Sequence, residues 1–174
     1  MATPQDMIRL YRYNQWAWRE VWPSLLKLTS QQAKQKRPFF WATIHGLAVH
    51  AVCAEWVWSS RLQGISPKAM WDPADFAELE HVYERWQKEN ERLQAYVVKL
   101  TEDDLNQTLH YQNTSGQAFS AAISDILRHV VNHATEHRSQ LTPELFRLGV
   151  PTRPLDYIGY SLTHPPQSLN RNDL

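Results

Sequence analysis

The chain has 174 residues, with 18 Lys or Arg side chains balanced by 18 Asp or Glu, so its formal net charge is zero. It has no basic stripe and no long acidic run, so nothing favours nucleic acid or an anionic membrane surface as a partner. Mean hydropathy is −0.55, and no apolar run approaches the roughly 18 residues that a transmembrane helix needs. We therefore expect neither a nucleic acid partner nor a membrane partner.

The length suits one domain with a proper hydrophobic core, and we expect residues 1–166 to form it, followed by a disordered polar tail over residues 167–174. The first residues lack the basic and then apolar pattern of a secretory signal. The single cysteine, Cys53, cannot form an internal disulfide, which suits a reducing compartment, so a cytoplasmic location is expected. Its apolar context predicts a small buried side chain rather than a nucleophile.

Helical periodicity dominates the first half of the chain. Apolar residues at intervals of three, four and seven predict a first helix over residues 4–28, which Pro23 should kink or shorten. Residues 29–38 are polar and basic and are expected to be a connection. A second helix is predicted over residues 43–62, with Gly64 as a stop signal just beyond it.

The second half mixes helices with one different segment. Residues 66–75 form a predicted loop, and Asp75 is a plausible N-cap for a third helix that ends near Leu100. Polar and apolar residues alternate within residues 106–119 around a turn-forming stretch, which predicts a small β-hairpin or an irregular excursion. A fourth helix should begin near Ser120, and Pro143 should either kink it or begin a new helix.

Three of the 8 histidines lie in the predicted fourth helix at four-residue intervals: His129, His133 and His137. Four residues advance an α-helix by about 400°, so successive imidazoles differ by only about 40° and lie on one face. Imidazole is the commonest metal ligand, and a pair at i and i+4 can grip a divalent ion. Two adjacent turns reach one ion more readily than three, so we expect His129 to be a neighbouring or packing residue.

Two ligands do not complete a metal site, so a third must come from elsewhere in the fold. His50 is the best candidate, because it lies mid-helix among apolar residues, where an unpaired imidazole would be costly to bury. His45 is about 140° around the same helix from His50 and cannot easily join it. His81, His110 and His164 lie in surface-like or tail contexts and are not expected to be ligands.

One rival motif overlaps the same residues. The segment from His133 to His137 spells H-x-x-E-H, the pattern of the inverzincin metallopeptidases, in which the glutamate, here Glu136, is the general base. Those enzymes take a further carboxylate ligand downstream. This chain offers there one glutamate, Glu144, and Asp156 as a weak substitute, so a peptidase is the weaker interpretation.

Two segments together resemble the DinB family, also described as the DinB/YfiT-like metalloenzyme superfamily. In the first, residues 43–64, His50 is followed by the acidic Glu55, by aromatic residues and by a terminal Arg-Leu-x-Gly. The second, residues 132–140, is similar to the family's Asn-His-x-x-x-His-Arg-Gly-Gln, and a weaker likeness follows over residues 148–157. Two positions depart from this pattern, because Ser139 replaces a glycine and Pro143 breaks the helical sequence soon after.

The resemblance implies an all-α four-helix bundle. It implies a divalent metal ion, nickel or zinc, held between the second and fourth helices by His50, His133 and His137. It also implies a homodimer and, since some members use low-molecular-weight thiols such as mycothiol, bacillithiol or glutathione, a possible thiol cofactor.

The function expected on this basis is a metal-dependent thiol (S-)transferase that acts on small electrophiles. Two alternatives stay open: a hydrolase that uses a metal-bound hydroxide, and a non-catalytic metal-binding or dimeric stress protein. Glu55 and Glu136 are weak candidates for catalytic residues, as proton acceptors or as groups that orient the histidines, with a solvated helix charge as the alternative for each. The weak candidates for cofactor binding, for which core packing is the main alternative, are Trp16, Trp56, Trp58 and Arg138.

Overall fold

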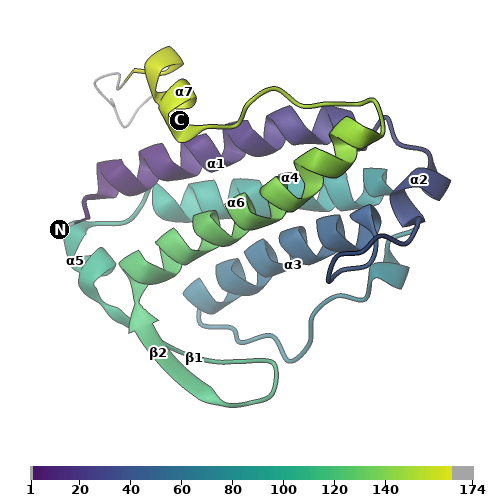
Figure 1. Ribbon diagram of the computed structural model, residues 1–174. Coiled ribbons are helices and arrows are strands. Elements are labelled where there is room, and N and C mark those ends of the chain that lie inside the picture. Colours follow the sequence, from purple (N-terminus) through teal and green to yellow (C-terminus); the bar gives the residue numbers. More distant parts are fainter. Residues whose placement is uncertain (1, 166–174) are drawn as a thin grey trace.

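The computed structural model describes residues 2–165 and is helical apart from one two-stranded sheet. Its four long helices are α1 (Pro4–Leu25), α3 (Ile44–Leu62), α4 (Leu79–Val97) and α6 (Ile123–Arg147). Each packs against two of the others, in the cyclic order α1, α6, α3, α4 (Figure 1). The expected all-α four-helix bundle is thereby confirmed. The predicted tail, residues 167–174, lies outside the described residues.

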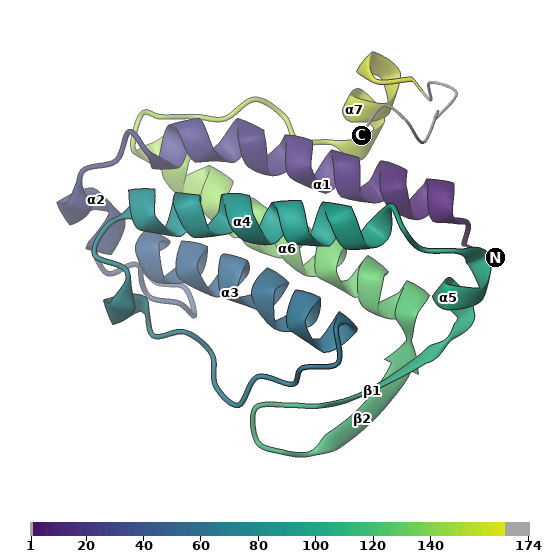
Figure 2. The same cartoon turned by 180° about the vertical axis from the view of Figure 1, so that it is seen from behind.

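The four long helices run in two opposite directions along the bundle. The chain runs along α1 and α6 in one direction and along α3 and α4 in the other (Figure 1, Figure 2). Consecutive helices α3 and α4 are therefore parallel, and residues 63–78 must return along the bundle between them. This crossover contains the short 3-10 helix η1 (Pro73–Asp75). The antiparallel pair α3 and α6 lies side by side and carries the candidate metal ligands.

Three short helices complete the fold: α2 (Ser30–Lys34), α5 (Glu102–Asn106) and α7 (Tyr157–Thr163). Capping boxes begin α1, α2 and α5, where a threonine accepts a hydrogen bond from the backbone three residues on. These threonines are Thr3, Thr29 and Thr101. The reciprocal bonds satisfy backbone donors that a helix end leaves free, so even five-residue helices can form.

Several of the predicted elements and their boundaries need correction. Helix α2 lies within residues 29–38, which were expected to be a connection, and α7 was not predicted at all. The third long helix begins at Leu79, because Asp75 belongs to η1 and the N-cap of α4 is Glu78. Pro23 lies in the last turn of α1, which ends at residue 25 rather than 28. Pro143 lies inside α6, which continues to residue 147, so no new helix begins there.

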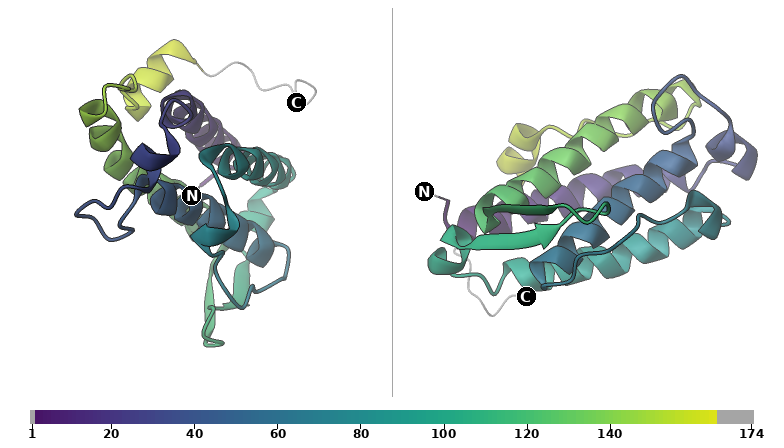
Figure 3. Two further views of the ribbon diagram at one scale, coloured as in Figure 1. Left: turned by 90° about the vertical axis from the view of Figure 1, so that its right-hand side faces the viewer. Right: turned by 90° about the horizontal axis from the view of Figure 1, so that it is seen from below.

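The segment that alternates in sequence is a β-hairpin. Strands β1 (Thr108–Gln112) and β2 (Ala118–Ala122) pair antiparallel, with His110 opposite Ser120. In the turn, the Asn113 side chain accepts two backbone N–H bonds, and Gly116 has a φ of +82°, a conformation that favours glycine. Helix α6 follows β2 without a loop, so it begins at Ile123 rather than near Ser120. The hairpin projects from the bundle near this junction (Figure 3).

The interior is divided into two apolar clusters along the bundle. One surrounds Trp18, Trp22 and Trp86, and the other surrounds Tyr11, Leu93 and further side chains toward the hairpin end. Buried polar side chains lie where the clusters meet: Asn14, Glu55, Glu89, Asn90 and Arg138. In the described part of the chain, every helix is too short or too polar to span a bilayer.

Candidate metal centre

Three histidines meet between α3 and α6. The Nε2 atom of His133 lies 3.3 Å from Nε2 of His50 and 3.0 Å from Nε2 of His137. The ligand atoms of all three lie within 4.8 Å of one another, although His50 and His133 are 83 positions apart in the chain. The His137 side chain is buried and the other two are half-buried. The structure therefore brings together the three side chains expected from sequence.

Gln140 determines which nitrogen of His137 faces the cluster. Its amide oxygen lies 2.9 Å from Nδ1 of His137. An amide oxygen can only accept, so Nδ1 carries the proton and the lone pair of Nε2 points toward the other histidines. Such a bond to the second ring nitrogen is typical of metal-binding histidines. The contact spans one helical turn, since position i+3 lies beside position i.

Trp41 orients His50 from the loop before α3. The two rings stack with centroids 3.6 Å apart and planes 18° apart. The loop turns sharply here: Ala42 has a φ of 59°, and the Thr43 N–H donates to the Trp41 carbonyl at 2.6 Å. A Cβ on Gly46 would lie 2.9 Å from that carbonyl oxygen, so glycine is required where the loop crosses α3. Backbone strain of this kind is often found at functional sites.

The pKa values of His50 and His133 are lowered, which favours the neutral form of both rings. Burial, together with the nearby His137 and His133, lowers the pKa of His50 to about 3. Burial, together with the nearby His137 and His129, likewise lowers the pKa of His133 to about 4. Neutral imidazole is the form that binds metal ions, so His50 and His133 need not first lose a charge-carrying proton at pH 7.

The donor set fits a divalent cation. Nε2 of His133 touches two other Nε2 atoms, but it carries either one proton or one lone pair and cannot satisfy both contacts well. Two nitrogens bound at about 2.0–2.1 Å to one tetrahedral ion lie about 3.3 Å apart. The observed separations of 3.0 and 3.3 Å are close to that value. The three histidines could therefore hold a metal ion.

The remaining histidines lie outside the cluster. His129 is exposed on α6, with its ring 5.7 Å from His133 and 5.2 Å from Trp58. His45 is buried elsewhere on α3, and its Nε2 atom has no hydrogen-bond partner among the described residues. The other histidines are exposed: His81, His110 and His164.

Glu55 and Arg138 belong to a separate buried network. Glu55 is only 3 % exposed and accepts hydrogen bonds from Asn14 Nδ2 at 3.2 Å and Trp18 Nε1 at 3.0 Å. Arg138 donates to Asn14 Oδ1 at 2.5 Å and to the Thr135 hydroxyl at 2.9 Å. Burial raises the pKa of Glu55 to about 7, although these hydrogen bonds and the Arg138 charge oppose it. Glu55 is thus not a solvated helix charge.

The three candidate tryptophans do not share one pocket. Trp16 packs on Tyr160 of α7, and Trp56 packs on Trp71 of the crossover. Only Trp58 adjoins the histidines, through His129.

The carboxylates considered for catalysis or for a peptidase also lie apart. Glu136 is exposed, and Glu144 pairs with Arg37 and Arg147. Neither of these carboxylates joins the three histidines in the described residues.

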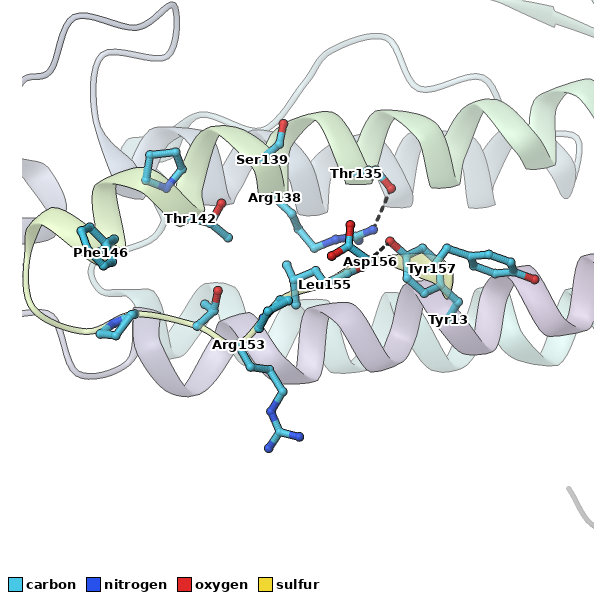
Figure 4. A pocket seen from close by; sticks show the side chains of 14 residues that line it. Tyr13, Thr135, Arg138, Ser139, Thr142, Phe146, Arg153, Leu155, Asp156 and Tyr157 are labelled. Atoms are coloured by element: carbon cyan, nitrogen blue, oxygen red, sulfur yellow. Dashed lines mark hydrogen bonds between the residues drawn. The ribbon is translucent and has the colours of Figure 1, made fainter. Parts of the chain in front are cut away.

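A cavity of about 730 Å³ lies on the other side of α6 (Figure 4). Arg138, Thr142 and Phe146 line it from α6, and Tyr13 and Asp156 face them from α1 and the C-terminal segment. Arg138 is five residues after His133, about 140° around the helix. This cavity is therefore distinct from the histidine cluster, and Asp156 lines it rather than approaching the histidines.

The fold and site define a class: a four-helix bundle with three histidines converging between two antiparallel helices. Comparison with known proteins gives the family. The DinB family profile matches residues 1–168. The protein DinB of Bacillus subtilis (strain 168) is 29 % identical over 159 residues, which cover 86 % of this chain and 90 % of that protein. The chain belongs to the DinB family.

Three residues were not predicted as site residues from the sequence: Gln140, Trp41 and Arg61. Gln140 could have been predicted from the sequence, because a glutamine at position i+3 from a helical histidine can form a hydrogen bond with its ring. Trp41 gave no such signal, because only the loop geometry places it on His50.

Proposed function

We propose that His50, His133 and His137 bind a divalent metal ion, nickel or zinc, and that the protein is a metal-dependent thiol transferase acting on small electrophiles. The observation that carries this proposal is the convergence of three Nε2 atoms, two of them on neutral, partly buried imidazoles. A bound divalent ion would lower the pKa of a thiol and hold its thiolate, the nucleophilic form.

The chain's own residues prepare the site for that role. Gln140 holds the proton of His137 on Nδ1, and Trp41 fixes the plane of the His50 ring. Because both rings are oriented before a ligand arrives, little ordering remains when one binds. Half-burial of His50 and His133 leaves an approach for a small molecule.

The carboxylates favour the transferase over the hydrolase alternative. Metal-dependent hydrolases commonly use a glutamate to take a proton from the metal-bound water. Glu55 is occupied by Asn14 and Trp18, and Glu136 is exposed outside the cluster. Thiol activation by coordination needs no such carboxylate, since a thiol is far more acidic than water.

The same proposal includes a homodimer as the working form. Large apolar side chains stand exposed on α7, where Ile158 is 66 % and Leu162 76 % exposed, and in the last turn of α6, where Phe146 is 72 % exposed. Exposed apolar patches of this kind often mark protein interfaces. Light scattering on the purified protein tests it, and a monomer at micromolar concentration would contradict it.

Metal analysis of the purified protein is the first test, followed by titration of the metal-free protein with nickel and zinc. We expect one ion per chain and its loss in His133→Ala, whereas the control His129→Ala should keep it. A protein that takes up neither ion would overturn the proposal.

Turnover is tested with a low-molecular-weight thiol and 1-chloro-2,4-dinitrobenzene as the electrophile. We expect metal-dependent consumption of thiol that is lost in His133→Ala. Metal-dependent ester hydrolysis without thiol would favour the hydrolase. Stoichiometric metal with neither activity would favour the non-catalytic alternative.

A further inference from the structure

We propose that Arg61 is an oxyanion-binding residue, and that it holds a carboxylate or phosphate group of a ligand that extends along α3 and α6 from the histidine cluster. Oxyanion binding at Arg61 is argued from its own surroundings. The statement that this oxyanion belongs to the substrate of the cluster rests on the proposed function.

Arg61 is a buried cation without an acceptor. It lies in the last turn of α3 and is only 7 % exposed. Its Nε atom is buried without a partner. The two terminal nitrogens also form no hydrogen bond or ion pair with a described residue, but they are not among the buried unpaired atoms and so reach solvent. Buried charges are normally paired, because an uncompensated one is costly. An arginine in this state is prepared for an anion from outside the chain.

Other sheltered arginines of the bundle differ in this respect. Arg138 donates to Asn14 and Thr135. Arg37 pairs with Glu144 at 3.2 Å, and Arg85 pairs with Glu89 at 2.9 Å. The Nε atoms of Arg37 and Arg85 are also unbonded, but each of these guanidinium groups has a carboxylate partner. Arg61 lacks the carboxylate as well.

Two aromatic rings hold the Arg61 guanidinium in place. Its Cζ atom lies 4.6 Å from the centre of the Trp58 ring and 4.9 Å from that of Tyr111 in β1. The two ring centres are themselves 5.1 Å apart, so the rings meet beside the guanidinium and do not enclose it. Aromatic faces stabilise the positive charge but offer its N–H groups no strong acceptor. Those N–H groups suit a carboxylate or a phosphate.

Arg61 lies on the His50 side of α3. The eleven residues between them make three turns plus about 20°, and about 16 Å along the axis. The Arg61 side chain lies back over Trp58, toward the cluster, and Trp58 contacts His129, which adjoins His133. These groups form a continuous row across the two helices. A ligand that reaches both ends would carry its oxyanion on the order of 10–15 Å from the atom that meets the histidines.

The first test uses metal-free protein and does not depend on the proposed function. The Nε–H signal of Arg61 in a 15N correlation spectrum, assigned by its absence in Arg61→Lys, is followed during titration with sodium hexanoate, hexyl phosphate and hexan-1-ol. We expect a saturable shift with one or both anions and none with the alcohol, and the stronger anion identifies the preferred oxyanion. The Arg85 signal is the control and should stay unchanged. Absence of a saturable shift, or an equal shift with the alcohol, would overturn the proposal.

The second test asks whether one ligand binds the metal ion and Arg61 at the same time. Nickel-loaded protein is titrated with 8-mercaptooctanoate and with 8-mercaptooctan-1-ol, and thiolate-to-nickel absorption reports binding. We expect the carboxylate to bind roughly ten- to a hundredfold tighter, since hydrogen bonds between charged groups are the strong ones. Arg61→Met should remove that preference and leave the neutral thiol unchanged, whereas Arg85→Met should keep it.

The outcomes separate this inference from the function on which it builds. If nickel binds but Arg61→Met keeps the preference for the carboxylate, the inference fails and the metal site stands. If neither nickel nor zinc binds but the first test succeeds, the oxyanion site stands and the proposed function fails.

Discussion

Two groups of polar side chains in the interior of this bundle differ in how well their hydrogen-bonding atoms are paired. In the network of Asn14, Glu55 and Arg138, donors face acceptors at 2.5–3.2 Å. In the histidine cluster, nitrogens face nitrogens at 3.0 and 3.3 Å, and one proton cannot serve both contacts. The first arrangement stabilises the helices by itself. A bound cation would satisfy the second, which is why we assign a structural role to the first and propose ligand binding for the second.

The contributions of the two groups to the stability of the fold also change with pH in opposite directions. The pKa of Glu55 is raised from 4.5 to about 7, so its contribution to stability is complete below pH 4.5 and is lost as the pH rises to 7. The pKa values of His50 and His133 are lowered from 6.5 to about 3 and about 4. Their contribution is complete above pH 6.5 and is lost as the pH falls toward 4 and then 3.

The largest expected effect is on the satisfied network. Arg138→Met would leave Asn14 Oδ1 without its donor and Glu55 without the nearby charge that favours its ionised form. We expect the free energy of unfolding to fall by about 3–5 kcal/mol, as when one partner of a buried polar pair is removed. Urea denaturation of metal-free protein at pH 7 measures it. The exposed Arg128→Met is the control, and an equal effect of both would contradict the structural role.

The next effect should fall on ligand binding rather than folding. His133→Ala removes one of three ligands. Four-ligand zinc sites release about 10–16 kcal/mol, so one ligand accounts for about 2.5–4 kcal/mol of metal binding. Without metal, we expect the variant to unfold at a similar or higher urea concentration, because it removes a crowded imidazole. A variant that binds nickel and zinc as the parent does would end the distinction between the two groups.

Substitution of Gln140 tests how strongly the orientation of the His137 ring affects metal affinity. Gln140→Ala removes the acceptor of the Nδ1 proton, so the ring is free to turn and to change tautomer. Loss of such a partner typically costs a factor of about 10–100 in metal affinity. Competition titration against a chelator of known affinity measures it, with Gln63→Ala, a glutamine substitution just after the end of α3, as the control. Unchanged affinity would show that packing alone orients His137.

The smallest expected effect is a change in how steeply the free energy of unfolding depends on pH. Glu55→Gln keeps an acceptor for Asn14 and Trp18 but cannot ionise. We expect the stability of the variant relative to the parent to increase with pH between 4.5 and 7, by at most about 1.4 kcal/mol per pH unit. Denaturation of metal-free protein at several pH values gives the difference. A flat difference across this window would mean that Glu55 titrates normally in the fold.

The sequence predicted most of the architecture, because local patterns carry it. Periodicity revealed the four long helices, and alternation with a turn signal revealed the hairpin of β1 and β2. The errors occurred where two local signals compete. Asp75 looked like a helix cap but lies in η1, and Pro143 looked like a break but is accommodated within α6. In each case neighbouring packing decided between options that the local sequence leaves nearly equal in energy.

What the sequence determined by itself is the set of histidines and the face that two of them share, because helical spacing of four residues places His133 and His137 one turn apart. Only the tertiary structure decided the rest. It brought His50 to them across 83 positions, set Trp41 on its ring, and left Arg61 buried without an acceptor. These relations depend on the crossover that makes α3 antiparallel to α6, and no local pattern encodes the packing of segments so far apart in the chain.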